Sequence, residues 1–475
     1  MSDMTPRVPM LIGGQWREAV QHDIVRDPFR NLIVCASPRS TLADLDDALE
    51  AAVAARDIAA DTPAFERAAL LRRVASRLTK ECEALASCMS AETGKALKDA
   101  RAEISRSIET LIISAEEAVR IQGEHVPLDS APMGVGKLAV MLRFPIGVVA
   151  AITPFNAPIN LVCHKIGPAI AAGNTVVLKP PPQASLTVHR LVEIFVGEGI
   201  APGVLNVVYG NEVGPALVQD PRVDFISFTG STRVGLQIKQ SCGLRRVALE
   251  LGGIGPVIVH DDADIAEAAV MCARNSVRLA GQSCVSVQIV HVHRSVADRF
   301  ADRLVRAVRA MKVGDPLDPE TDVGPMIDEG AARRVESWVA EAVSAGALVL
   351  TGGSREGALM QPTVMTQVRP DMKVACEEAF GPIVSILPYD DVETVFDAIS
   401  ESRFGLQCGL FTRALPLAMR AIRRLRTGGV ILNGTSTWRV DGMPYGGVKD
   451  SGIGREGPRY VIKEMTEERL AVFNI

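Results

Sequence analysis

The sequence predicts an α/β fold in which parallel strands alternate with helices. The chain has 475 residues, of which 47% are apolar and 23% charged, so it is long enough to bury several cores. From residue 145 onward, short apolar runs alternate with stretches of helical periodicity, which is typical of a parallel sheet with helices on both faces. The same alternation returns between residues 254 and 434. These observations predict two α/β units with peripheral strands.

The residues before the first unit are expected to be mostly helical. Residues 8–17 indicate two short strands around a diglycine turn. Thr41 and Asp44 have the spacing of a capping box, which predicts a helix start just after the threonine. Apolar residues recur with helical periodicity over residues 64–90 and 95–120, so two long amphipathic helices should follow.

Within the two units, each apolar run predicts a strand and each periodic stretch predicts a helix. In the first unit, strands are expected at residues 148–153, 176–178, 205–209 and 225–228, with helices at 159–172, 186–198 and after Ser231. In the second unit, strands are expected at 257–259 and 287–292, with helices at 262–278 and 295–311. A last strand should lie near residues 470–473, after a glycine-rich segment.

Composition and charge exclude several classes of protein. The net charge of −5 argues against a nucleic-acid partner, and the longest apolar run is too short to cross a membrane. Nine cysteines, an odd number without any CxxC pair, indicate neither a disulfide scaffold nor a zinc ribbon. His291 and His293 alternate along a predicted strand, and two ligands alone make no metal site, so none is expected. Because no apolar leader opens the chain, a cytoplasmic location is expected.

Two segments of the first unit are candidates for binding a nucleotide. The run from Phe225 to Gly235 indicates a strand, a turn of small residues and a helix start, where free backbone N–H groups bind phosphate. No GxGxxG motif is present, so an ordinary helix cap at Gly230 and Ser231 is the alternative. Lys179 ends an apolar run ahead of three prolines, and it either donates to a ribose or phosphate or is simply solvated.

Three polar residues are candidates for chemistry. Cys284 follows a predicted helix in a small, polar context, where it is either a nucleophile or one of the chain's inert thiols. Glu250 ends an apolar run and is either a general base or a solvated turn residue. Asn156 precedes an Ala-Pro pair, and its amide either binds an oxyanion or caps the turn.

These segments belong to a series of motifs that resembles the aldehyde dehydrogenase superfamily over nearly the whole chain. The motifs are, in order, Thr153-Pro154-Phe155-Asn156, Gly173-Asn174-Thr175-Val176-Val177-Leu178-Lys179-Pro180, Phe228-Thr229-Gly230-Ser231, Glu250-Leu251-Gly252-Gly253, Gly281-Gln282-Ser283-Cys284, Glu377-Glu378-Ala379-Phe380-Gly381-Pro382 and Gly446-Gly447-Val448-Lys449-Asp450-Ser451-Gly452. Each is weak alone, but their order and the 34 residues between Glu250 and Cys284 make the resemblance specific. The pattern looks most like the branch of lactaldehyde, non-phosphorylating glyceraldehyde-phosphate and phosphonate-aldehyde dehydrogenases.

The resemblance implies oxidation of an aldehyde to its carboxylic acid. Cys284 matches the nucleophile that forms a thiohemiacetal and then a thioester, and Asn156 matches the side-chain amide of the oxyanion hole. Glu250 matches the base that activates the hydrolytic water, which favours release of a free acid over transfer to coenzyme A. A coenzyme A-acylating enzyme and an inactive family member with a structural or binding role remain the alternatives.

The resemblance also implies NAD or NADP as cofactor. Lys179 matches the contact to the adenosine ribose, Ser231 the contact to the pyrophosphate, and Glu378 the carboxylate on the nicotinamide ribose. The remaining cofactor contacts are expected from Thr153, Pro154, Phe155, Gly210, Gly230, Leu251, Gly252 and Phe380. Many members that prefer NAD have a glutamate where this chain has Pro182, so we expect use of both cofactors.

Three residues are candidates for reading the substrate. Arg106 lies on a helix that, by the resemblance, borders the substrate tunnel. His164 lies in the helix after Asn156, and Arg439 lies in the loop before the Gly446-Gly447 pair. An arginine binds an acidic group with two hydrogen bonds. The alternatives are a packed helix residue for His164 and a plain ion pair for Arg106. With 4% aromatic residues, a small polar or anionic aldehyde is favoured, such as lactaldehyde, glycolaldehyde, a semialdehyde or a phosphono-aldehyde.

The domain organisation follows from the same resemblance. Residues 1–125 and 148–253 are expected to form a Rossmann-like NAD(P)-binding domain, and residues 254–440 an α/β catalytic domain. Residues 126–147 and 456–475 should form a β arm that pairs with a second copy of the chain, because strand edges need a partner. A homodimer or homotetramer is therefore expected.

Overall fold

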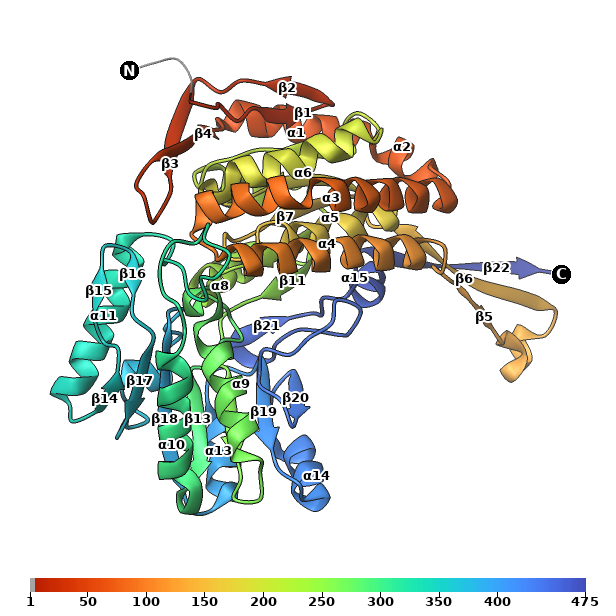
Figure 1. The fold of residues 1–475 in the computed structure, drawn as a ribbon. Helices are drawn as coiled ribbons and strands as arrows, with labels where there is room; N and C mark the ends of the chain where they lie inside the picture. Colours follow the sequence, from red (N-terminus) through yellow and green to blue (C-terminus); the bar gives the residue numbers. More distant parts are fainter. Residues whose placement is uncertain (1–4) are drawn as a thin grey trace.

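Two large sheets organise the molecule, which is represented by a computed structural model that describes residues 5–475 (Figure 1). Both sheets are mostly parallel and carry helices on their faces, which confirms the predicted α/β class. The first sheet has the strand order β2-β1-β9-β8-β7-β10-β11-β21, and the second has the order β14-β17-β18-β13-β12-β19-β20. Among the described residues, no helix combines the length and apolar character that a membrane crossing requires.

The first sheet has a parallel centre with antiparallel strands at both edges. Its strands are β1 (Met10–Ile12), β2 (Gln15–Arg17), β7 (Val148–Ile152), β8 (Thr175–Lys179), β9 (Leu205–Val207), β10 (Phe225–Thr229), β11 (Arg246–Glu250) and β21 (Gly452–Ile453). The helices of this unit are α1 (Leu42–Ala54), α2 (Arg56–Asp61), α3 (Ala64–Thr93), α4 (Leu97–Ala118), α5 (Asn160–Ala171), α6 (Ser185–Gly197), α7 (Val213–Gln219), α8 (Thr232–Ser241) and α15 (Pro458–Glu464).

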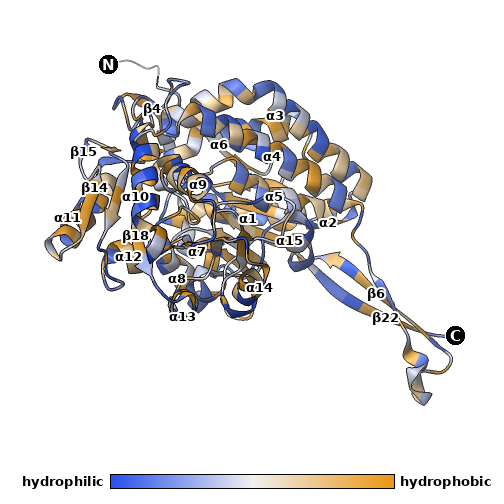
Figure 2. Ribbon diagram, turned by 60° about the horizontal axis from the view of Figure 1, so that its bottom comes forward, coloured by the Kyte–Doolittle hydropathy of each residue, from blue (hydrophilic) through white to orange (hydrophobic). Residues whose placement is uncertain are grey.

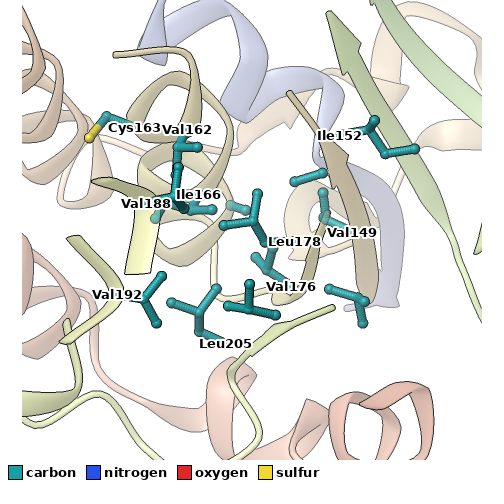
Figure 3. Packing of buried hydrophobic residues seen from close by; sticks show 14 of the residues in the cluster. Val149, Ile152, Val162, Cys163, Ile166, Val176, Leu178, Val188, Val192 and Leu205 are labelled. Atoms are coloured by element: carbon teal, nitrogen blue, oxygen red, sulfur yellow. The ribbon is translucent and has the colours of Figure 1, made fainter. Parts of the chain in front are cut away.

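The core of the first unit lies between this sheet and its helices. Figure 3 shows apolar side chains from β7, β8 and β9 packing against side chains from α5 and α6. The labelled members are Val149, Ile152, Val162, Cys163, Ile166, Val176, Leu178, Val188, Val192 and Leu205, all of them buried. Because the strands are buried on both faces, they are continuously apolar rather than alternating.

The second sheet is parallel except for the edge pair β14–β17. Its strands are β12 (Pro256–Val259), β13 (Ile289–His293), β14 (Leu348–Thr351), β17 (Thr363–Thr366), β18 (Ile383–Tyr389), β19 (Gln407–Phe411) and β20 (Gly429–Leu432). Its helices are α9 (Ile265–Val277), α10 (Arg294–Arg309), α11 (Glu329–Ser344), α12 (Lys373–Cys376), α13 (Val392–Glu401) and α14 (Leu415–Arg424).

A third, three-stranded sheet projects from the body of the molecule (Figure 2). It consists of β5 (Glu124–Val126), β6 (Lys137–Pro145) and β22 (Thr466–Asn474), and β6 pairs with β22 along its whole length. Two hairpins, β3 (Gln21–Arg26) with β4 (Ile33–Arg39) and β15 (Arg355–Glu356) with β16 (Leu359–Met360), complete the strands. The short 3₁₀ helices are η1 (Leu128–Ser130), η2 (Pro132–Gly134), η3 (Pro182–Ala184), η4 (Arg278–Gly281) and η5 (Lys449–Ser451).

Most predicted elements are present, and local capping explains where their ends differ. The capping box is confirmed, since Asp44 N donates to Thr41 Oγ1 at 3.1 Å and Thr41 N donates to the Asp44 carboxylate at 2.8 Å. Helix α3 continues past the predicted residue 90 and ends at Gly94, whose φ is +72°. Helix α9 begins at Ile265, later than predicted, because the Asp264 side chain accepts from the first free amides.

Two glycines bring the first sheet's last turn against the segment that carries Cys284. After β11, the chain crosses to the second sheet through residues 251–255. A Cβ on Gly253 would collide with the Cys284 carbonyl oxygen, and one on Gly255 would collide with the Ser286 carbonyl oxygen. Gly255 also has a φ of +45°, which side-chain-bearing residues rarely adopt. The close approach of the two units therefore depends on the absence of side chains here.

We expect Gly255→Ala to lower the free energy of unfolding by at least about 1–3 kcal/mol, because it adds a steric clash to an unfavourable φ. Urea unfolding followed by circular dichroism measures the change. Gly314→Ala is the matched control, since a Cβ there meets no atom within 4 Å, and it should stay within about 0.5 kcal/mol of wild type. Equal stability of the two variants would contradict this account of the crossing.

Candidate active site

A cavity of about 450 Å³ lies between the two sheets and brings the chemical candidates together. Asn156, Glu250 and Cys284 all line it, although they come from the turn after β7, the end of β11 and the segment before β13. The carboxyl ends of parallel strands are where open α/β sheets bind ligands. The cavity therefore brings a thiol, a carboxyl and an amide together.

The segment before Cys284 has strained backbone. Leu279 and Ala280 adopt φ values of +56° and +51°, a conformation that costs about 1–3 kcal/mol per residue and persists only where the surroundings fix it. Gln282 supplies part of that fixation: its side-chain oxygen accepts from Ile327 N at 2.9 Å, and its carbonyl accepts from Asn156 Nδ2 at 3.0 Å. The strain and these bonds together position the thiol at the cavity wall.

Cys284 is held by a neighbour that the sequence did not single out. The Tyr445 Oη lies 3.3 Å from the Cys284 Sγ. Burial raises the pKa of the thiol to about 12, while the hydrogen bond with Tyr445 acts in the opposite direction. The carboxylates of Glu378 and Glu250 add to the rise.

Glu250 is a buried carboxyl with a free oxygen. Its side chain is buried, and its Oε2 has no hydrogen-bond partner among the described residues. Burial raises the pKa of Glu250 well above its usual value, and the nearby charge of Glu456 raises it further, while Lys165 and Arg439 oppose the rise. A carboxylate with a raised pKa is a stronger base than an exposed one.

Ionisable side chains lie at and behind the far wall of the cavity, and Arg106, Arg439 and Glu456 line it. We call the whole group the charge cluster: Arg106, His164, Lys165, Arg439, Asp441 and Glu456. Asp441 Oδ1 lies 2.6 Å from Arg106 Nη2 and 2.8 Å from His164 Nε2. Glu456 lies 3.5 Å from Arg439 Nη2 and 3.6 Å from Lys165 Nζ. These contacts hold the pKa of Asp441 and of Glu456 low despite the burial that would raise both.

The three substrate candidates differ in their access to the cavity. Arg106 and Arg439 line it, whereas His164 does not and is fully buried behind it. Burial lowers the pKa of His164, and its ring lies 3.0 Å from Arg439 Nη2 as well as against Asp441. The structure thus places His164 as a support for the two arginines and not as a residue that touches a ligand directly.

The nucleotide candidates form the other wall. Pro154, Phe155, Gly230, Ser231 and Leu251 line the cavity at the ends of β7, β10 and β11. The Ser231 side chain caps α8 by accepting from Val234 N. The amides at this helix start face the carboxyl edge of the sheet, which is a favourable position for a phosphate.

The second unit also contributes residues to this part of the cavity. Glu378 and Phe380 line the cavity, and the Phe380 ring meets the Phe155 ring edge-to-face at 6.0 Å. Glu378 accepts from Gly253 N at 3.2 Å, and burial raises its pKa to about 7. A Cβ on Gly252 would lie 2.6 Å from the Glu378 carboxylate, so the glycine allows this contact although it does not line the cavity.

Besides Gly252, three predicted cofactor contacts lie outside the cavity lining. Thr153 is buried at the end of β7. Lys179 ends β8 and donates to Asn211 Oδ1 at 3.0 Å; burial lowers its pKa to about 8, and Glu212 partly offsets that. Gly210 has a φ of +96° and lies beside Glu212. These residues share the carboxyl edge of the first sheet with the cavity wall.

Sequence reasoning missed the roles of several residues that line the cavity or lie behind its wall. Tyr445 directly precedes the quoted Gly446-Gly447 motif, yet nothing in the pattern showed that its hydroxyl reaches the thiol. Lys165 did carry a usable signal, because it is a charged residue inside an otherwise apolar helical stretch and is fully buried. Glu456 and Asp441 gave no such signal, since both lie in irregular polar segments.

Comparisons with known proteins find related sequences and solved structures that cover nearly the whole chain. A family model described as the aldehyde dehydrogenase family matches residues 16–470. A 3-sulfolactaldehyde dehydrogenase of Priestia aryabhattai is 44% identical over 469 residues, which cover 98% of both chains. The crystal structure of aldehyde dehydrogenase 21 from Physcomitrella patens with the reaction product succinate has a TM-score of 0.96 at 37% identity and covers 99% of both chains. NADP-dependent glyceraldehyde-3-phosphate dehydrogenase from Bacillus halodurans C-125, complexed with NADP, has a TM-score of 0.96 at 34% identity and covers 98% of this chain and 99% of its own.

Glu250→Gln should stabilise the fold, and more so as the pH rises. The raised pKa of Glu250 means that the folded state keeps the carboxyl protonated where the unfolded state, with a pKa of about 4.3, has lost the proton. Wild type therefore loses stability as the pH rises above that value, whereas glutamine does not titrate. The difference in unfolding free energy should grow by up to about 1.4 kcal/mol per pH unit above pH 5.

Urea unfolding at pH 5, 6, 7 and 8 measures this difference. Glu50→Gln, at an exposed carboxylate at the surface of α1, is the control and should leave the pH dependence of stability unchanged. A difference between Glu250→Gln and wild type that stays constant over this range would show that Glu250 is ionised in the folded state throughout.

Proposed function

The chain belongs to the aldehyde dehydrogenase family, and we propose that it oxidises a small acidic aldehyde to its carboxylic acid with NAD or NADP. The observation that carries the proposal is one cavity lined by Cys284, Glu250 and Asn156 together with two arginines of the charge cluster. The first three residues account for the chemistry, and the arginines account for the choice of substrate.

The reaction begins at Cys284. Its thiolate attacks the carbonyl carbon of the aldehyde, and the oxygen that becomes negative is stabilised by the Asn156 amide and the Cys284 backbone N–H. The Asn156 amide is held in place because its Nδ2 already donates to the Gln282 carbonyl. NAD or NADP, when bound, would supply the hydride acceptor for oxidation of the adduct on Cys284.

Glu250 then removes a proton from the water that hydrolyses the thioester. Its Oε2 has no partner among the described residues and is free to accept that proton. Burial raises the pKa of this carboxyl well above its usual value, which makes its carboxylate a stronger base than an exposed one. Hydrolysis releases the free acid and restores the thiol, which argues against coenzyme A as the acyl acceptor.

The residues at the sheet's carboxyl edge fit a dinucleotide. Thr153 and Thr229 have buried hydroxyls without partners among the described residues, and the start of α8 offers free amides. Ser231 would hold the pyrophosphate, Lys179 the adenosine ribose and Glu378 the nicotinamide ribose. Pro182 supplies no carboxylate that would repel a 2′-phosphate, which supports use of both cofactors.

An acidic group on the aldehyde is supported by the arginines in the wall. Arg106 binds Asp441 through Nε and Nη2, its side chain is 30% exposed, and its Nη1 donates to no partner among the described residues. A guanidinium with a free edge binds a sulfonate, carboxylate or phosphate through charge-assisted hydrogen bonds. The descriptions of the three relatives each name an acidic compound: 3-sulfolactaldehyde, the product succinate and glyceraldehyde-3-phosphate.

The projecting sheet supports assembly with a second copy of the chain. Leu142, Leu470 and Val472 on β6 and β22 are 45–56% exposed although they are apolar, and the edges of this sheet have unpaired backbone groups. Pairing of this arm with the sheet edge of a second copy would cover the apolar side chains and the unpaired backbone groups. Such pairing would give a homodimer or a homotetramer.

The purified enzyme should reduce NAD and NADP in the presence of 3-sulfolactaldehyde or succinic semialdehyde, measured by absorbance at ~340 nm as the reduced nicotinamide forms. Cys284→Ala should lose at least about 10³-fold in kcat, because the covalent route is closed. Adding coenzyme A should not change the product, identified by mass spectrometry. Silence of the wild type on acidic and neutral aldehydes with both cofactors would overturn the proposed activity.

Arg106→Gln should raise KM for the acidic aldehyde by about tenfold or more while changing KM for propanal less than about twofold, because one charge-assisted contact is lost. Arg101→Gln removes an exposed arginine on the same helix, which pairs with Glu83, and serves as the control. An equal rise in KM for both aldehydes would reject a charge-reading role for Arg106.

A further inference from the structure

We propose that the Tyr445 hydroxyl is a further catalytic group, which donates a hydrogen bond to the Cys284 sulfur and stabilises it as the thiolate that attacks the aldehyde. The proposal rests on the proposed function for the attack itself, but the hydrogen bond can be tested without any turnover. It is carried by the 3.3 Å contact between Tyr445 Oη and Cys284 Sγ inside the cavity.

Contacts of its backbone and of its ring hold Tyr445 in place. The backbone of Tyr445 pairs with that of Glu456 at 2.6 and 3.1 Å, and its side chain packs with Val285 and Leu406. The guanidinium of Arg439 lies 3.9 Å from the ring centroid, which is close enough for a cation–π contact. These contacts hold the ring with its hydroxyl toward the sulfur.

The contact favours the thiolate over the thiol. In the thiol form, the weak S–H donor meets the tyrosine oxygen; in the thiolate form, the O–H donates to a negative sulfur. Hydrogen bonds to an ionised partner are about twice as strong as neutral ones. The proton that the thiol loses passes to water in the cavity. Once the sulfur bonds to the carbonyl carbon, it becomes a weak acceptor, so the hydroxyl acts on the step before that bond forms.

The charges around the pair set the direction of the effect. Cys284 faces the carboxyl groups of Glu250 and Glu378, which disfavour a second negative charge, and Arg439, which favours it. Tyr445 faces Glu250 and the thiol, and burial with these groups raises its pKa well above the usual value, so the hydroxyl keeps its proton and remains a donor. Because two carboxyl groups oppose the thiolate, a neutral donor that contacts the sulfur directly is needed to offset them.

Tyr445→Phe removes the hydroxyl and keeps the ring under Arg439. The matched control is Tyr389→Phe, which removes a hydroxyl that contacts His260 at 2.9 Å on β18, outside the cavity. The readout is the rate of alkylation of Cys284 by iodoacetamide against pH, quantified by mass spectrometry on the peptide that contains it. This measurement needs neither aldehyde nor cofactor, so it distinguishes failure of the hydrogen bond from failure of the proposed reaction.

In Tyr445→Phe, the pH at which Cys284 ionises should rise by about one to two units, the amount expected for losing a hydrogen bond to a charged group. A thiolate of higher pKa is intrinsically more nucleophilic, which recovers about half of the loss on a logarithmic scale. Alkylation at a fixed pH below the inflection should therefore slow by about three- to tenfold. Tyr389→Phe should match wild type.

Turnover gives the second readout. The kcat/KM of Tyr445→Phe should fall by about the same three- to tenfold as the alkylation rate, because both rates depend on the thiolate at a pH below the pKa of Cys284. An unchanged alkylation profile in Tyr445→Phe, in protein whose thermal unfolding midpoint matches wild type, would overturn the proposal. A kcat/KM deficit that accompanies an unchanged alkylation profile would indicate a packing role for the ring.

Discussion

The site depends on the buried contact of Arg439 with Glu456 and Tyr445. The guanidinium balances the charge of Glu456 and lies over the tyrosine ring, and that ring carries the hydroxyl that reaches Cys284. Removing one partner of such a buried pair costs about 3–5 kcal/mol, because the remaining charge is left without compensation. The same cluster raises or lowers the pKa values of the groups around it, including that of Glu250. Geometry and proton affinity in the cavity are therefore coupled through one set of side chains.

The two sheets supply complementary parts of this site. The first sheet ends its parallel strands at the cavity and presents the amide of Asn156 and the carboxyl of Glu250. The second unit presents Cys284 on a strained segment, with Glu378 beside it. Glycines at the crossing allow the backbones to meet, so the distances within the site are set by backbone contact and not by flexible side chains. This arrangement explains why neither unit alone contains the chemistry.

The sequence predicted the order of the elements well, because periodicity and turn residues are local signals. Helix ends were less accurate, since caps such as Asp264 decide them over a few residues. His164 shows the main limit of the prediction. Its position in the helix after Asn156 suggested a place near the substrate. Its side chain instead contacts Asp441 and does not line the cavity, which depends on tertiary packing. The contact between Tyr445 and Cys284 joins residues 161 positions apart, which no single-sequence pattern indicates.

The central claim is that an acidic aldehyde is oxidised through a covalent thioester on Cys284. Trapping that thioester tests it most directly. In Glu250→Gln, hydrolysis lacks its base, so mixing the variant with 3-sulfolactaldehyde and NADP should let the acyl enzyme accumulate. Rapid acid quench and peptide mass spectrometry should then find the mass of the acyl group on the peptide that contains Cys284. Reduced NADP formed without any adduct, or an adduct on another cysteine, would contradict the account.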